Sequence, residues 1–199
     1  LEQPHVPFLE TRDGGETWAA VDAPMAQLDW EVQVRGDRAW ALASAGLYAL
    51  DLGDASAEQL SADATAAAWG DDGLEAWVTD EGVYAASGAR LGDAPVIAGA
   101  LAQDPDDADH LVLAARDGEG LHESFDGGDS WSQVFTQGGE AFRSIDMAGS
   151  VGAVSGASGV AVSENTGSSW SWESIPLITG WDPPYDDFDA VCVNGDRVW

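Results

Sequence analysis

Short runs of alternating apolar and polar residues cover most of the chain, and Gly, Asp and Ser separate them about every 8 to 12 residues. Alternation over a few residues is typical of β-strands that bury one face. The 3.6-residue period of an amphipathic helix is missing throughout the sequence. The chain is therefore predicted to be all-β, with short antiparallel strands.

The strand pattern repeats along the chain. The predicted third strands align on Phe8, Leu47, Val83, Leu121 and Val160, at intervals of 39, 36, 38 and 39 residues. A period near forty with four strands in each unit is typical of the blades of a β-propeller. We expect one propeller domain over 1–199, with about five blade repeats. The predicted units are 5–28, 29–63, 64–94, 95–139 and 140–180, with a partial unit at 181–199.

The two end units are predicted to be incomplete. Residues 5–22 contain a third and a fourth strand, whereas 188–199 contain a first strand and the start of a second. Two such half-blades could pair and close a ring of five blades. Alternatively, the chain is a window from a six- to eight-bladed propeller. We prefer the window because the sequence ends at Trp199, in the middle of a predicted strand. Within the complete units, weak fourth strands are expected near Gln59 and Leu91.

Three stretches share the frame Ser/Thr-x-Asp/Asn-x-Gly-x-Ser/Thr-Trp. In each, a carboxylate or amide can accept from backbone N–H groups, Gly allows a tight reversal, and Trp restarts an apolar strand. The frame therefore predicts a β-hairpin. The third copy departs from the other two, with Asn165 for Asp and Thr166 for the first Gly. The frame positions are Thr11, Asp13, Gly15, Thr17 and Trp18, then Ser124, Asp126, Gly128, Ser130 and Trp131, then Ser163, Asn165, Gly167, Ser169 and Trp170.

This frame resembles the Asp-box, or BNR repeat, of β-propellers such as sialidases, xyloglucanase-type glycosidases, sortilin-like receptors and photosystem II assembly factors. The resemblance implies that each box is a structural hairpin between the third and fourth strands of a blade. Asp13, Asp126 and Asn165 are then expected to hold turns rather than to catalyse a reaction. Because these families differ in activity, the resemblance indicates a fold and not a substrate.

The charge balance excludes some partners. The 36 acidic residues face 7 arginines and no lysine, which gives a formal net charge of −29. Nucleic acids and anionic membranes would be repelled, and the apolar runs are too short for membrane insertion. Such a surface resembles that of halophilic proteins, although a specific role in cation binding is an alternative. We expect an extracellular or cell-surface location in a salt-adapted organism.

Catalytic and metal sites are weakly indicated. A sialidase-like site would need a cluster of arginines, but Arg35, Arg38 and Arg197 are expected in turns. A xyloglucanase-like site needs two carboxylates about 5 to 10 Å apart, for which the sequence offers too many candidates. His110 could ligate a metal with Asp106 or Asp109, but their solvated Asp-Pro turn favours no site. No metal and no cofactor are predicted.

The single cysteine, Cys192, excludes an intrachain disulfide and is expected to be a small buried residue within Ala-Val-Cys-Val.

One loop combines aromatic rings and carboxylates. Residues 179–189 are stiffened by two prolines, and rings beside acids suit the apolar faces and hydroxyl groups of sugars. Packing of these rings between blades is the alternative interpretation. The candidate ligand residues are Trp181, Asp182, Tyr185, Asp186, Asp187 and Phe188.

The sequence thus favours a non-catalytic propeller that acts as a binding or scaffold module for a protein or carbohydrate ligand. The alternative is a glycoside hydrolase of the xyloglucanase-like kind, or another carbohydrate-active propeller.

Overall fold

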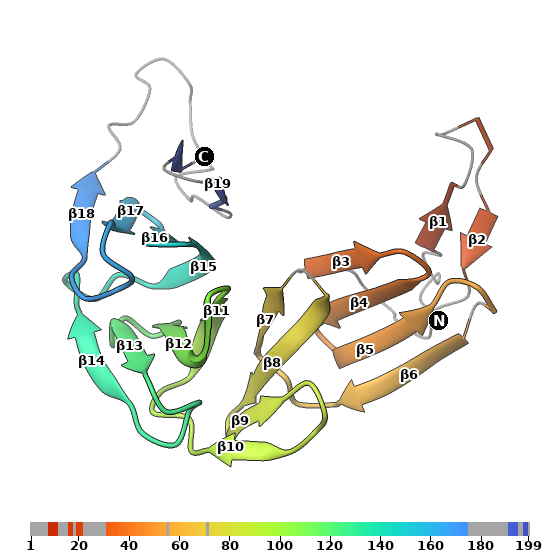
Figure 1. Ribbon diagram of the computed structural model, residues 1–199, viewed down its shortest axis with the longest axis horizontal. Coiled ribbons are helices and arrows are strands. Elements are labelled where there is room, and N and C mark those ends of the chain that lie inside the picture. Colours follow the sequence, from red (N-terminus) through yellow and green to blue (C-terminus); the bar gives the residue numbers. More distant parts are fainter. Residues whose placement is uncertain are drawn as a thin grey trace, which may run out of the picture. The chain divides into compact units, whose positions relative to one another are not determined.

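The computed structural model describes residues 8–11, 16–17, 19–21, 31–54, 56–70, 72–174, 191–194 and 197–198. This part of the chain contains antiparallel strands and no helix (Figure 1). The described residues accordingly include no helix that is long and apolar enough to cross a membrane. The chain divides into two compact units, Leu1–Ala64 and Thr65–Trp199.

The first unit contains one two-stranded and one four-stranded antiparallel sheet. The strand order is β1-β2 in the smaller sheet and β3-β4-β5-β6 in the larger one. Ser56–Ser61 forms a full six-residue strand, so the expectation of a weak fourth strand near Gln59 was wrong. The strands are β1 (Phe8–Glu10), β2 (Ala19–Val21), β3 (Glu31–Arg35), β4 (Arg38–Ala43), β5 (Gly46–Asp51) and β6 (Ser56–Ser61).

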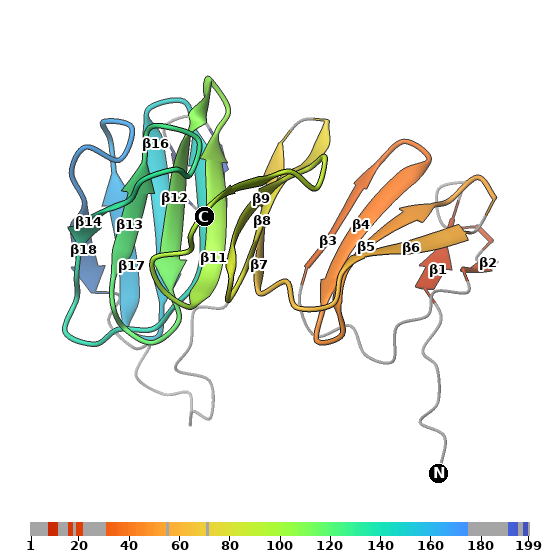
Figure 2. The ribbon, with the colours of Figure 1, turned by 90° about the horizontal axis from the view of Figure 1, so that it is seen from below.

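The second unit contains three four-stranded sheets and a short pair, each with its strands in chain order. Figure 2 shows the strands of the β11–β14 and β15–β18 sheets running alongside one another. The strands are β7 (Ala66–Gly70), β8 (Gly73–Thr79), β9 (Gly82–Ala85), β10 (Arg90–Gly92), β11 (Ala98–Asp104), β12 (Asp107–Ala115), β13 (Leu121–Ser124), β14 (Ser132–Phe135), β15 (Phe142–Ala148), β16 (Val151–Gly156), β17 (Gly159–Ser163), β18 (Ser171–Ser174), β19 (Val193–Asn194) and β20 (Arg197–Val198).

The stacking of sheets explains the apolar run of β12. Leu111 and Leu113 belong to the core shared with β7 and β8, whereas Val112 and Ala114 belong to cores shared with the β15–β18 sheet. Successive side chains of a strand point to opposite faces, and both faces are covered here. The middle strand is therefore apolar at consecutive positions instead of alternating.

A glycine begins or directly precedes the third strand of each complete sheet, because the fourth strand passes close by. A Cβ on Gly120 would overlap the main-chain oxygen of Phe135, and a Cβ on Gly46 would overlap that of Ser61. Both glycines also have a positive φ, +95° and +115° respectively, which other residues rarely adopt. The recurring glycine of the repeat thus has a steric cause.

The expectations about Cys192 and about three arginines were wrong. Cys192 is exposed, because the buried Val191 and Val193 flank it and alternation turns its side chain to the opposite face. Arg35 ends β3 and Arg38 begins β4, so these arginines belong to strands. Arg197, expected in a turn, begins β20.

Candidate functional site

The Ser124–Trp131 stretch forms a closed hydrogen-bonded turn between β13 and β14. One carboxylate oxygen of Asp126 accepts from the Ser130 N–H at 2.9 Å and from the Ser124 hydroxyl at 2.7 Å. The other accepts from the Ser130 hydroxyl at 2.5 Å. The Gly128 N–H donates to Ser124 Oγ at 2.8 Å, and Trp131 Nε1 donates to the Gly128 carbonyl at 3.1 Å.

These donors change the acidity of Asp126. The Ser130 hydroxyl, followed by the Ser130 N–H and the Ser124 hydroxyl, lowers the pKa of Asp126 to about 2. Hydrogen bonds to the ionised form of a carboxyl have this effect. A permanently ionised carboxylate whose oxygens are already engaged by donors is poorly suited to general acid–base work near neutral pH.

In the Ser163–Trp170 stretch, Asn165 contacts serines at the same positions of the turn as Asp126 does in the other. Asn165 Oδ1 accepts from the Ser163 hydroxyl and from the Ser169 N–H, each at 2.9 Å. The amide Nδ2 donates to Ser169 Oγ at 2.9 Å, which reverses the direction of the corresponding bond in the other turn. Thr166 has φ +56° where Gly127 has +70°, so this turn contains a β-branched residue in the left-handed region.

Other predicted residues lie partly or wholly outside the described part of the chain. Of the first frame, Thr11 and Thr17 are described, but Asp13, Gly15 and Trp18 are not. The whole loop 179–189, with Trp181, Asp182, Tyr185, Asp186, Asp187 and Phe188, also lies outside the described residues.

A buried polar cluster, which we call the His110 cluster, consists of Asp104, His110 and Glu123. These residues come from β11, β12 and β13, and their exposed fractions are 3%, 1% and 2%. His110 Nδ1 lies 3.1 Å from Asp104 Oδ2, whereas His110 Nε2 lies 4.0 Å from Glu123 Oε1. His110 thus pairs with Asp104 and not with Asp106 or Asp109, the partners that the sequence analysis considered for a metal site.

Glu123 also connects its sheet to the turn of the next one. Trp170 Nε1 donates to Glu123 Oε1 at 3.2 Å across 47 residues of sequence. A Cβ on Gly167 would overlap the same carboxylate oxygen, so the next turn closes directly over Glu123. Burial raises the pKa of the Glu123 carboxyl, although the Trp170 N–H and the charge of a protonated His110 act in the opposite direction.

Phe125 covers the His110 cluster on its outer side. Its ring stacks on the imidazole of His110 with centroids 4.5 Å apart and planes 7° apart. The residue is nevertheless 60% exposed, so the other part of the ring faces solvent. The Gly127 N–H donates to the Asp109 carbonyl at 2.9 Å, which holds this turn against the acidic start of β12.

The geometry of the His110 cluster does not suit a metal. Its two carboxylates lie at the two different nitrogens of one imidazole ring, so the three groups do not converge on one point. Among the described residues, no group of three or more His, Cys, Asp and Glu side chains could hold a metal ion.

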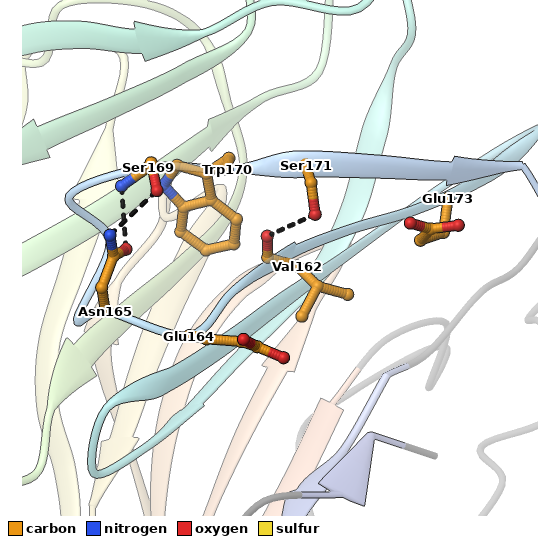
Figure 3. A pocket seen from close by; sticks show the side chains of 7 residues that line it. All are labelled: Val162, Glu164, Asn165, Ser169, Trp170, Ser171 and Glu173. Carbon is orange, nitrogen blue, oxygen red and sulfur yellow. Dashed lines mark hydrogen bonds between the residues drawn. The ribbon is translucent and has the colours of Figure 1, made fainter.

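A pocket of about 540 Å³ lies on the β15–β18 sheet, and Figure 3 shows the side chains that line it. Its walls include the indole of Trp170 and the carboxylates of Glu164 and Glu173, which lie on either side of Val162 in this view. The pocket is lined by Val162, Glu164, Asn165, Ser169, Trp170, Ser171 and Glu173.

Sequence reasoning missed Asp104, Glu123 and Phe125. The burial of His110 could have been predicted from the sequence. Alternate residues of a strand lie on the same face, so His110 shares its face with the apolar Val112 and Ala114. Its partners could not be found in this way, because they depend on the register of three strands.

No protein-family model matches the chain, and no curated protein matches it. Solved structures do resemble it. YCF48 bound to a D1 peptide has a TM-score of 0.58 and 16% identity, and the match covers 83% of this chain and 60% of that one. The extracellular domain of BT4673 from B. thetaiotaomicron has a TM-score of 0.61 and 13% identity, with 84% and 25% covered.

A further solved structure that resembles the chain is described as a β-propeller. The β-propeller domain of Cps50 (Swd1) from Myceliophteria thermophila has a TM-score of 0.57 and 12% identity, with 80% of this chain and 57% of that one covered. The described sheets and these likenesses together show that the chain has a β-propeller fold, as the strand pattern predicted. The chain spans from a quarter to 60% of the length of these three structures.

Proposed function

We propose that this chain is an Asp-box β-propeller module that binds a protein partner and catalyses no reaction. The Asp, Asn and Ser side chains of the frame are engaged within the two described box turns. The His110 cluster is buried, and a catalytic acid or base must reach its substrate. The frame residues, including those outside the described part, are proposed to hold turns.

The observation that carries the proposal is the exposed ring of Phe125, which is held in place by stacking on His110. Its ring is 60% exposed, yet it rests on the imidazole of His110, which lies 3.1 Å from Asp104. A rigid aromatic side chain loses little conformational entropy when a partner covers it. Aromatic anchors of this kind dominate the binding energy of many protein interfaces.

The surroundings of Phe125 favour a basic partner. Asp106 in the β11–β12 turn and Asp107 and Asp109 at the start of β12 are exposed, and the box turn that carries Phe125 is held against Asp109. Arginine can stack its guanidinium on an aromatic face and pair with carboxylates at the same time. The net charge of −29 would also steer a basic segment toward the surface. YCF48, one of the structural neighbours, is itself bound to a peptide.

The test compares binding of an (Arg-Gly)4 peptide to the full chain and to two variants, by fluorescence anisotropy in one buffer. Phe125→Ala should weaken binding about 5- to 30-fold, because a cation on an aromatic face contributes about 1–2 kcal/mol. Val134→Ala, which removes a 36% exposed apolar side chain from β14, is the matched control and should bind normally. Equal binding by all three proteins would refute the proposed surface.

A carbohydrate-active propeller is the second candidate, and the pocket in Figure 3 favours it. The pocket combines the indole of Trp170 with the carboxylates of Glu164 and Glu173, and aromatic rings beside carboxylates suit sugar ligands. Release of reducing ends from a panel of plant and microbial polysaccharides in high salt would support an enzyme. Loss of that release in both Glu164→Gln and Glu173→Gln would assign it to this pocket.

A further inference from the structure

The unpaired nitrogen of His110 is the least explained polar atom of the His110 cluster. His110 Nε2 is buried and has no hydrogen-bond partner among the described residues. Buried polar atoms without partners are rare, because each costs the free energy of the water contacts it has lost. The Glu123 carboxylate lies beside this nitrogen, with Oε1 4.0 Å away.

The protonation states of the two residues decide whether this arrangement is favourable. A proton on Nδ1 lets His110 donate to the Asp104 carboxylate. In a neutral imidazole, Nε2 then has a lone pair and no proton. A lone pair facing an ionised carboxylate in a buried site is unfavourable for both groups. One additional proton removes the conflict, either on Nε2, to form an ion pair, or on Glu123, to donate to Nε2.

We propose that His110 and Glu123 share one proton at neutral pH, and that this proton fastens the β11–β14 sheet to the box turn of the β15–β18 sheet. The pair then binds one proton more than the same residues would in the unfolded chain, where the carboxyl is ionised and the imidazole is largely neutral. The proposal is independent of the partner-binding function.

The other charged groups around His110 and Glu123 are carboxylates, and none of them supplies a positive charge or a proton to the pair. On β11, Asp104 lies at Nδ1. On β12, Asp107 and Asp109 are exposed, and Asp109 lies beside Gly127. In the box turn after β13, the oxygens of Asp126 accept from Ser124 and Ser130, and Asp129 is exposed.

From the next sheet, the box turn places uncharged groups over the pair. Trp170 donates to Glu123 Oε1, and the backbone of Gly167 lies against the same oxygen. Glu164 in that turn is exposed. Loss of the shared proton would therefore leave a buried negative charge at this sheet contact, where the Trp170 N–H donates to the Glu123 carboxylate.

The sign of the pH effect follows from linkage. Because the folded state holds one more proton than the unfolded state, its stability falls as pH rises above neutrality. The folding equilibrium constant should fall by up to tenfold per pH unit until the pair loses its proton. The experiment is urea unfolding of the full chain between pH 7 and 8.5 at a fixed molar NaCl concentration.

Two variants that each remove one negative charge separate the pair from the general acidity of the chain. Glu123→Gln imitates the protonated acid, because its amide can donate to Nε2 and accept from Trp170, so its stability should be nearly independent of pH in this window. Glu164→Gln removes an exposed charge from the neighbouring box turn and should keep the wild-type slope. A wild-type slope near zero, or equal slopes in the wild type and Glu123→Gln, would overturn the proposal.

A direct readout covers the case in which Glu123→Gln does not fold. Nuclear magnetic resonance of the His110 ring nitrogens and the Glu123 carboxyl carbon in the wild-type chain reports both groups at pH 7.5, with His110→Asn to assign the ring signals. An imidazolium, or a neutral imidazole beside a protonated Glu123, supports the shared proton. A neutral imidazole beside an ionised Glu123 contradicts it.

Discussion

Gly167→Ala should destabilise the protein by more than its backbone conformation alone explains. Gly167 has φ +78°, and any L-residue in that region costs about 1–2 kcal/mol. In addition, the new Cβ would overlap Glu123 Oε1 and displace the carboxyl from Trp170 Nε1. A buried hydrogen bond left unmade costs roughly 1–3 kcal/mol, so the additional loss should be about 2 kcal/mol.

Gly139→Ala is the matched control. Gly139 has φ +84°, and a Cβ there would meet nothing within 4 Å, so this variant isolates the backbone cost. An additional ~2 kcal/mol corresponds to a melting midpoint roughly 4–8 °C lower for Gly167→Ala than for Gly139→Ala, for a chain of this size. Circular dichroism melts of both variants in the same molar salt buffer measure the difference.

The Glu123→Ala background tests the cause. Without the carboxylate, Gly167→Ala should cost no more than Gly139→Ala does, and the coupling energy between positions 123 and 167 should be about 2 kcal/mol. Equal midpoints for the two glycine variants in the wild-type background would show that Glu123 does not support the next turn. The contact described between the sheets would then be wrong.

Two further predictions concern pH and salt. Because the folded pKa of Asp126 is about 2, below its ordinary value near 3.8, its contribution to stability is present above pH 4 and lost as pH falls through about 2. Asp126→Asn should remove this part of the acid dependence, and an unchanged acid unfolding profile would contradict it. For salt, the charge of −29 implies that the melting midpoint rises between about 0.1 M and 2 M NaCl as repulsion is screened. Equal midpoints in thermal melts at the two concentrations would mean that the acidic surface does not limit stability.

The class of fold could be predicted from the sequence because its causes are local. The alternation of apolar and polar residues indicated the strands. A glycine such as Gly120 indicated the start of each third strand, because a side chain there would overlap the fourth strand. The box turn at Asp126 closes through residues at most four positions apart, so its frame is visible in eight letters. Where the local signal was thin, as at Ser56–Ser61, the strength of the strand was underestimated.

The candidate site depended on contacts that no local pattern contains. Strand register placed Glu123 opposite Val112, which brought it near His110, 13 residues earlier in the chain. The stacking of one sheet on the next brought Trp170 to Glu123 across 47 residues. The sequence by itself therefore determined the strands, the turns and the surface charge, because each follows from neighbouring residues or from simple composition. Only the tertiary structure decided that His110 lies between two carboxylates and beneath Phe125, because these partners depend on strand register and on the turn that follows β13.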